Sequence, residues 1–209
     1  MSLLAMLNLT GTRILRSLSQ ATRGQQRALA VLVQDVKNRQ SPLKAKYSED
    51  PDSAIVVMKA EGTICNETMS VKVLGGPGQC VADNDGSMVT MSGLHSAAGG
   101  DGTEACSGDM LLQSLVACAG VTFRAVWNAF GMGSITSGKI VATGEMDFRG
   151  TLGVDKTAPV GLTKVDLEFE IDSEEDPGKV AKAVAMTERF CVIYQTLRSG
   201  VDQLEGRTV

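Results

Sequence analysis

A long apolar segment in the middle of the chain constrains its fold more than any other feature. Ser107 is a favourable helix N-cap, Asp109 follows in the first turn, where a carboxylate stabilises the helix dipole, and Gly131 marks a helix stop. Between them, apolar residues lie on nearly every side of a helix: Met110, Leu111, Leu112, Leu115, Val116, Val121, Phe123, Val126 and Trp127. A helix that is apolar all round is buried, so we predict a central helix from Ser107 to about Phe130.

Short strand-like segments flank this helix on both sides. They are rich in β-branched residues, and the last one alternates at period two from Val165 to Ile171. The segments are 54–60, 69–74, 79–82, 139–148 and 161–171. A Gly/Ser/Asp-rich loop is predicted over 83–108, and a second long helix over 174–199. The predicted order is β-β-β-α-β-β-α, an α+β fold.

The N-terminal segment differs from the rest of the chain in charge. Residues 1–46 hold eight Lys or Arg residues and one acid, Asp35, although the whole chain has a net charge of −4. A helix is predicted near 25–40, and Pro42 and the cluster at 48–53 are predicted to end this N-terminal segment. We therefore predict a basic helical N-terminal arm over 1–50 and a main domain over 51–209. A packed arm, a targeting remnant and a polyanion-binding arm are all compatible with this composition.

Composition excludes several classes of protein. Five irregularly spaced cysteines in 209 residues are not a secreted disulfide framework, which favours a reducing, cytoplasmic setting. No apolar run reaches the roughly 18–20 residues of a membrane-spanning helix, so no membrane partner is expected. The single histidine, His95, cannot supply a typical zinc site, and no phosphate-binding loop is present. We therefore expect no metal, no cofactor and no nucleic-acid partner.

Two cysteines are candidate site residues. Cys118 and Cys191 are 73 positions apart, and each is predicted to lie in the middle of an apolar helix. This spacing matches neither a zinc knuckle nor a CxxC motif. It is typical of a peroxidatic and resolving pair that meets only in the fold, although a buried cysteine often serves packing alone. Asp109 is open to the same question, since it is either a dipole partner or a catalytic group.

The chain resembles the OsmC/Ohr family of thiol-dependent hydroperoxide reductases over about residues 54–200. The first motif is Asp109-Met-Leu-Leu-Gln-Ser-Leu-Val-Ala-Cys118, the second is Gly144-Glu-Met-Asp147-Phe-Arg-Gly150, and the third is Glu188-Arg-Phe-Cys191. The resemblance implies an intertwined homodimer in which sheets from both chains enclose two long helices. It also implies that Cys118 is peroxidatic, Cys191 is resolving, Asp109 occupies a catalytic carboxylate position, and an external dithiol is the reductant.

Two residues of the family pattern are absent. The first hairpin, 61–73, contains no Arg to activate the thiol, and Gly108 stands where the most active branch has Glu, which indicates a divergent branch. We predict a thiol-dependent peroxidase for organic hydroperoxides that acts in oxidative stress defence. The alternative is a non-catalytic OsmC-like dimer that binds a small molecule or senses redox state. The apolar residues expected to favour organic peroxides over hydrogen peroxide are Leu115, Val121, Phe123 and Phe190.

Overall fold

The computed structural model describes residues 38–57, 60–65, 70–75, 89–202 and 204–206. The chain divides into two compact units, one ending at Val56 and one beginning at Val57. In the first unit, a helix over 38–49 is followed by the short helix η1 (Pro51–Ala54). The helix over 38–49 continues through Pro42 and ends at Glu49, inside the 48–53 cluster that was predicted to end the arm. The first 37 residues of the predicted arm lie outside the described residues, so the arm over 1–50 stays a prediction.

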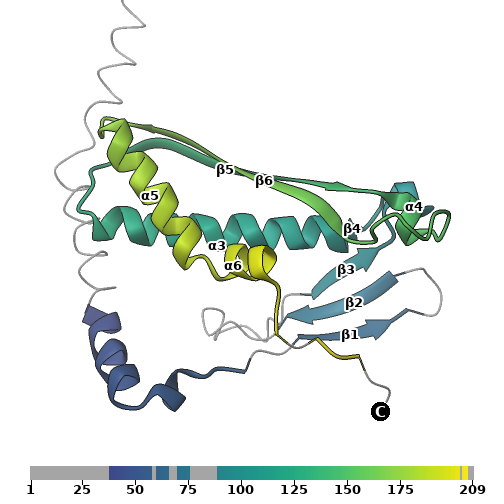
Figure 1. The fold of residues 1–209 in the computed structure, drawn as a ribbon, viewed down its shortest axis with the longest axis horizontal. Helices are drawn as coiled ribbons and strands as arrows, with labels where there is room; N and C mark the ends of the chain where they lie inside the picture. The colour runs from purple at the N-terminus through teal and green to yellow at the C-terminus, as the bar shows by residue number, and fades with distance from the viewer. Residues whose placement is uncertain (1–37, 58–59, 66–69, 76–88, 203, 207–209) are drawn as a thin grey trace, which may run out of the picture. The chain divides into compact units, whose positions relative to one another are not determined.

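The second unit begins with a four-stranded sheet in the order β1-β2-β3-β4 (Figure 1). Its strands are β1 (Ala60–Ile64), β2 (Ser70–Gly75), β3 (Val89–Gly93) and β4 (Ala105–Cys106). The first three pair antiparallel, and β4 pairs parallel with β3. The second predicted strand matches β2, and the third, 79–82, lies outside the described residues. Strands β3 and β4 both fall inside the predicted loop 83–108. The many Gly and Ser residues there obscure the sequence pattern typical of a β-strand.

The central helix is α3 (Ser107–Ala129), in close agreement with the prediction. Its N-cap is Cys106 rather than Ser107, and the Cys106 Sγ accepts a hydrogen bond from the Gly108 N–H at 3.3 Å. At the other end, the Trp127 Nε1–H donates to the Gly133 carbonyl at 2.7 Å. Among the described residues, α3 is the one helix long and apolar enough to span a bilayer. Here it is instead the helix on which α5, α6 and β5 pack.

Two long strands form an antiparallel ribbon along α3 (Figure 1). They are β5 (Ile135–Met146) and β6 (Leu162–Ser173), joined through the short helix α4 (Phe148–Thr151). Close packing explains why Gly144 and Gly150, the two glycines of the second family motif, have no side chain. A Cβ at Gly150 would lie 2.3 Å from the Pro159 carbonyl oxygen, and one at Gly144 would lie 3.1 Å from a Leu162 methyl. Asp147 caps α4 and pairs with Arg149 at 2.6 Å.

The second long helix of the prediction is two helices. They are α5 (Pro177–Phe190) and α6 (Val192–Ser199), and both pack on α3 (Figure 1). Cys191 lies between them with φ −74° and ψ 113°, an extended conformation that interrupts the helix. Ala183 and Thr187 are the fully buried residues of α5, whereas α6 has none. The prediction of one continuous helix over 174–199 is therefore wrong at the position of the second candidate cysteine.

Candidate active site

The fold brings the two predicted cysteines together. Cys118 is in the middle of α3, and the Cys191 thiol donates a hydrogen bond to its sulfur. Cys191 is fully buried, in a core cluster with Leu115 and Ala119, and half-buried Cys118 packs against that cluster. Two thiols separated by 73 positions thus become neighbours through the packing of α5 and α6 on α3.

Cys191 closes one helix and starts the next. Its backbone N–H donates to the Thr187 carbonyl at 2.8 Å, which completes the last turn of α5. Its sulfur accepts from the Tyr194 N–H at 3.5 Å, and its carbonyl accepts from the Gln195 N–H at 3.0 Å. The side chain of Cys191 is therefore the N-cap of α6, in the position where a hydroxyl or carboxylate oxygen is most common.

The sulfur of Cys118 faces the start of α6. Burial in the protein raises the pKa of its thiol, because a charged sulfur is poorly solvated there. Hydrogen bonds from the backbone N–H groups of Ile193 and Val192, the Cys191 thiol and the Thr122 hydroxyl act in the opposite direction. Together they outweigh burial, and the pKa of Cys118 lies below the ordinary value of 9.0.

The pKa of Cys191, in contrast, is raised above its ordinary value. Burial is the largest cause and raises it, and the Cys118 sulfur raises it further, since a thiolate at Cys118 repels a second negative charge. The hydrogen bond from the Tyr194 N–H only partly offsets these effects. Cys118 is thus the member of the pair that ionises first, while Cys191 holds its proton.

The N-terminus of α6 supplies partial positive charge at Cys118, where the family pattern has an Arg that this sequence lacks. The first N–H groups of α6 have no partner within the helix and carry its positive dipole end, a setting that stabilises a thiolate. Within the part of the chain that the structure describes, no Arg or Lys side chain is a principal influence on Cys118. Sequence reasoning missed these donors because backbone N–H groups belong to every residue except proline, so no residue type marks them.

The third predicted site residue lies elsewhere on α3. Asp109 is in the first turn of the helix, nine residues before Cys118, which corresponds to about 13.5 Å along the helix axis. It borders a cavity of about 560 Å³ that is also lined by Leu112, Gln113 and Ala142. The structure therefore does not bring Asp109 to the two thiols, and its catalytic role stays a prediction.

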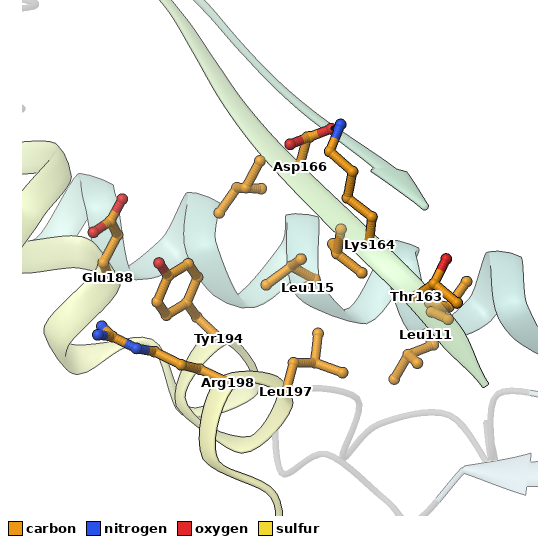
Figure 2. Close-up of a pocket in the computed structure, with 12 residues that line it drawn as sticks. Leu111, Leu115, Thr163, Lys164, Asp166, Glu188, Tyr194, Leu197 and Arg198 are labelled. Carbon is orange, nitrogen blue, oxygen red and sulfur yellow. Dashed lines mark ion pairs between the residues drawn. The ribbon is translucent and has the colours of Figure 1, made fainter. Parts of the chain in front are cut away.

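A second cavity, of about 540 Å³, lies between α3, β6, α5 and α6 (Figure 2). Leu115 and Tyr194 belong both to its wall and to the cluster that contains the cysteines. The wall is mixed in character, with apolar side chains beside charged ones: Leu111, Leu115, Leu162, Val165, Leu167 and Leu197, and Lys164, Asp166, Glu188 and Arg198. Lys164 and Asp166 form an ion pair on β6.

The apolar residues predicted to line the substrate site are only partly placed there. Leu115 lines the cavity, but Phe123 is buried in a second core cluster with Trp127. Val121 is 74% exposed and Phe190 is 56% exposed, and neither borders the cavity. In their place, β6 and α6 supply Leu162, Val165 and Leu197, which could be found only from the packing of these elements on α3.

Within the described part of the chain, no three His, Cys, Asp or Glu side chains are grouped so as to hold a metal ion. His95 caps the short helix η3 (Ser96–Ala98), where its Nδ1 accepts from the Ala97 N–H at 3.0 Å. Its ring lies against Phe148, with the ring centroids 4.9 Å apart. The histidine is thus engaged in a loop contact away from the cysteines.

A family model described as OsmC-like protein matches residues 100–203, the part of the chain that carries both cysteines. No curated protein matches the chain. Among solved structures, the chain is similar to the OsmC like protein from Mycoplasma pneumoniae, at 16% identity and a TM-score of 0.53, covering 69% of this chain and 89% of that one.

It is also similar to a protein from Legionella pneumophila described as an organic hydroperoxide resistance protein OsmC, predicted redox protein and regulator of sulfide bond formation. That match has 17% identity and a TM-score of 0.51, and it covers 71% of this chain and 94% of the other. An OsmC-like protein of unknown function from Vibrio cholerae matches at 12% identity and a TM-score of 0.50, covering 68% and 94%. At these identities the likeness to solved structures concerns the fold. Together with the family match, it shows that this chain belongs to the OsmC-like protein family.

Proposed function

We propose that the protein is a thiol-dependent peroxidase that reduces organic hydroperoxides through Cys118 and Cys191. The observation that carries the proposal is that two thiols 73 positions apart meet in one cluster, whose members Leu115 and Tyr194 also line a cavity. The pKa of Cys118 is lowered and that of Cys191 is raised, which supports Cys118 as the attacking thiol. Thiolates are the nucleophilic form of cysteine, and a resolving step requires a second thiol nearby.

The reaction needs no group beyond these thiols, the peroxide and an external reductant. The Cys118 thiolate attacks the distal oxygen of ROOH, an S–O bond forms as the O–O bond breaks, and the departing alkoxide takes up a proton to give ROH. The Cys191 sulfur then attacks the sulfenic acid at Cys118, and its proton leaves with the oxygen as water. A dithiol reduces the resulting disulfide by exchange and is itself oxidised to a disulfide.

The cavity beside the thiols supports an organic substrate. Its leucines and valine offer apolar surface to an alkyl group, at about 25 cal/mol per Å² buried. Hydrogen peroxide has no alkyl group and gains nothing from this surface. Leu115 and Tyr194 line the cavity and belong to the cysteine cluster, so a bound alkyl chain would lie in the cavity with its peroxide end directed toward Cys118.

We further propose that the protein is a homodimer of the cytoplasm that serves oxidative stress defence. Val121 on α3, Phe190 at the end of α5 and Val192 at the start of α6 are 74%, 56% and 61% exposed. Apolar side chains at these positions are the kind that a subunit interface covers. The irregular spacing of the five cysteines supports a reducing compartment.

The test is turnover of cumene hydroperoxide with dithiothreitol, measured for wild type, Cys118→Ser and Cys191→Ser. Wild type should turn over, and Cys118→Ser should be inactive. Cys191→Ser should complete one reduction and then accumulate sulfenic or sulfinic acid at Cys118, detected by mass. Wild-type activity no greater than that of Cys118→Ser would refute the proposal. Asp109→Asn, assayed beside them, tests the predicted carboxylate.

A second candidate function is a non-catalytic dimer that binds a small molecule or senses redox state. It is favoured by one observation, that among the described residues no Arg or Lys is a principal influence on Cys118. A thiol activated by hydrogen-bond donors without a cation reacts more slowly, so that oxidation by peroxide is a signal rather than a turnover step. Under this alternative, wild type forms the Cys118–Cys191 disulfide with peroxide but shows no sustained turnover with dithiothreitol.

A further inference from the structure

The junction between α5 and α6 is bridged by a side chain that the mechanism does not use. The end of any α-helix leaves its last four carbonyl groups without helical partners. At the end of α5, the Thr187 carbonyl accepts from the Cys191 N–H at 2.8 Å, and the Glu188 carbonyl accepts from the Gln195 side-chain amide at 2.7 Å. Gln195 lies on α6, so this bond joins the two helices across the break at Cys191.

The bridge connects a well-anchored helix to a weakly anchored one. Helix α5 is held on α3 by Ala183 and Thr187, both fully buried, and the Thr187 hydroxyl donates to the Ala183 carbonyl at 2.8 Å. Helix α6 has eight residues and no fully buried side chain. A helix this short is not stable by itself in water, so its position depends on the packing of Ile193 and Tyr194 against the core cluster and on contacts at its ends. The amide of Gln195 is one such contact, and it acts on the turn that faces Cys118.

We infer that Gln195 is a positioning residue, whose amide holds the first turn of α6 so that the N–H groups of Val192 and Ile193 face the Cys118 sulfur. This inference rests on the proposed function in so far as Cys118 is the attacking thiol. Gln195 touches neither the sulfur nor the substrate cavity. It acts through the backbone of α6, and without it the two donors turn away from the thiolate.

The other groups at the site do not depend on the placement of α6. Cys118 packs against the cluster of Leu115, Ala119 and Cys191, and Ile193 and Tyr194 of α6 pack against the same cluster. Cys191 keeps its proton, and the Tyr194 N–H donates to the Cys191 sulfur. The Thr122 hydroxyl also lowers the pKa of Cys118, but it belongs to α3, so a change at Gln195 affects only the α6 donors.

The test is the rate of Cys118 alkylation by iodoacetamide as a function of pH, followed by mass spectrometry of that residue. Gln195→Leu removes the amide at nearly constant size. The matched control is Thr196→Val, because the Thr196 hydroxyl donates to the Val192 carbonyl at 2.9 Å within α6 and does not cross the junction. We expect Gln195→Leu to slow alkylation at neutral pH by about twofold to fourfold, the scale of one hydrogen bond, and to move the pH midpoint upward. Thr196→Val should match wild type.

A Gln195→Leu profile that coincides with the wild-type profile would overturn the inference. If Gln195→Leu does not fold, as judged by circular dichroism, Gln195→Asn takes its place, since its amide is one methylene too short to reach the Glu188 carbonyl. The same upward midpoint is expected for it, and an unchanged one refutes the inference. Alkylation requires no peroxide, so a wild type without hydroperoxide turnover would defeat the proposed function and leave this result standing.

Discussion

Replacing Val192 by proline removes one backbone N–H from the Cys118 site while the start of α6 can stay in place. Val192 is the first residue of α6, the helix position in which proline is best tolerated. The residue before a proline must be extended, and Cys191 already has φ −74° and ψ 113°. The Val192 side chain is 61% exposed within the protomer and lies on the proposed subunit interface, so the effect of losing it is measured separately with Val192→Ala.

The expected effect follows from the bond that is lost. A hydrogen bond to a charged group contributes about 1.5–3 kcal/mol, and partial exposure of Cys118 favours the lower end. A loss of about 1.4 kcal/mol lowers the thiolate fraction about tenfold at a pH below the pKa of Cys118. A thiolate of higher pKa is also intrinsically more nucleophilic, which recovers part of the loss. The net alkylation rate should therefore fall about threefold to fourfold.

The assay compares Val192→Pro with Val192→Ala, which loses nearly the same side chain but keeps the N–H. Rates of Cys118 alkylation are measured from pH 6 to 10, and thermal melting is recorded to confirm that both variants are folded. The proline variant should be slower at neutral pH and reach its midpoint at a higher pH. Equal rates and midpoints in the two folded variants would show that the start of α6 does not activate Cys118.

Three further predictions concern pH, stability and assembly. Because the pKa of Cys118 is lowered, its alkylation rate in wild type should rise with pH and reach half its maximum below 9.0, whereas a midpoint at or above that value contradicts the geometry described. Trp127→Phe leaves the Gly133 carbonyl without its indole donor, so thermal melting should show a loss of about 1–3 kcal/mol, at about 2–4 °C per kcal/mol, and an unchanged melting temperature would be inconsistent with that bond. Val121→Glu places a charge on a 74% exposed apolar position, so light scattering should detect a monomer where wild type is a dimer, and a wild-type monomer would count against the proposed assembly.

The parts of this fold that could be predicted are those with a local signal. Helix α3 was predicted to within one residue at both ends because its apolar residues and first-turn acid lie within it and Gly131 follows its C-cap. Strand β6 was predicted from the alternation of Val165, Leu167, Phe169 and Ile171. Strand β3 has no comparable alternation in a segment rich in Gly and Ser, so its pairing with β2 could not be anticipated.

The break at Cys191 had no local signal. No Gly or Pro lies between Glu188 and Gln195, and the helical spacing of Thr187, Cys191 and Tyr194 continues across the break. The interruption depends on contacts that form only in three dimensions, such as the Gln195 amide on the Glu188 carbonyl. For the same reason, the two cysteines could be paired from the family resemblance, while the backbone donors at Cys118 could not be predicted.

Cys191 is both the C-cap of α5 and the N-cap of α6, which limits the residues that this position can accept. The residue must be extended, must accept a hydrogen bond from the Tyr194 N–H, and must be fully buried. Alanine satisfies burial but leaves α6 uncapped, at about 1 kcal/mol, and Asp or Asn would bury more polar atoms than one donor can satisfy. Serine and cysteine remain, and they differ at this position mainly in the chemistry of one atom. The local geometry therefore makes the serine variant a close structural copy of the native site, from which the redox chemistry alone has been removed.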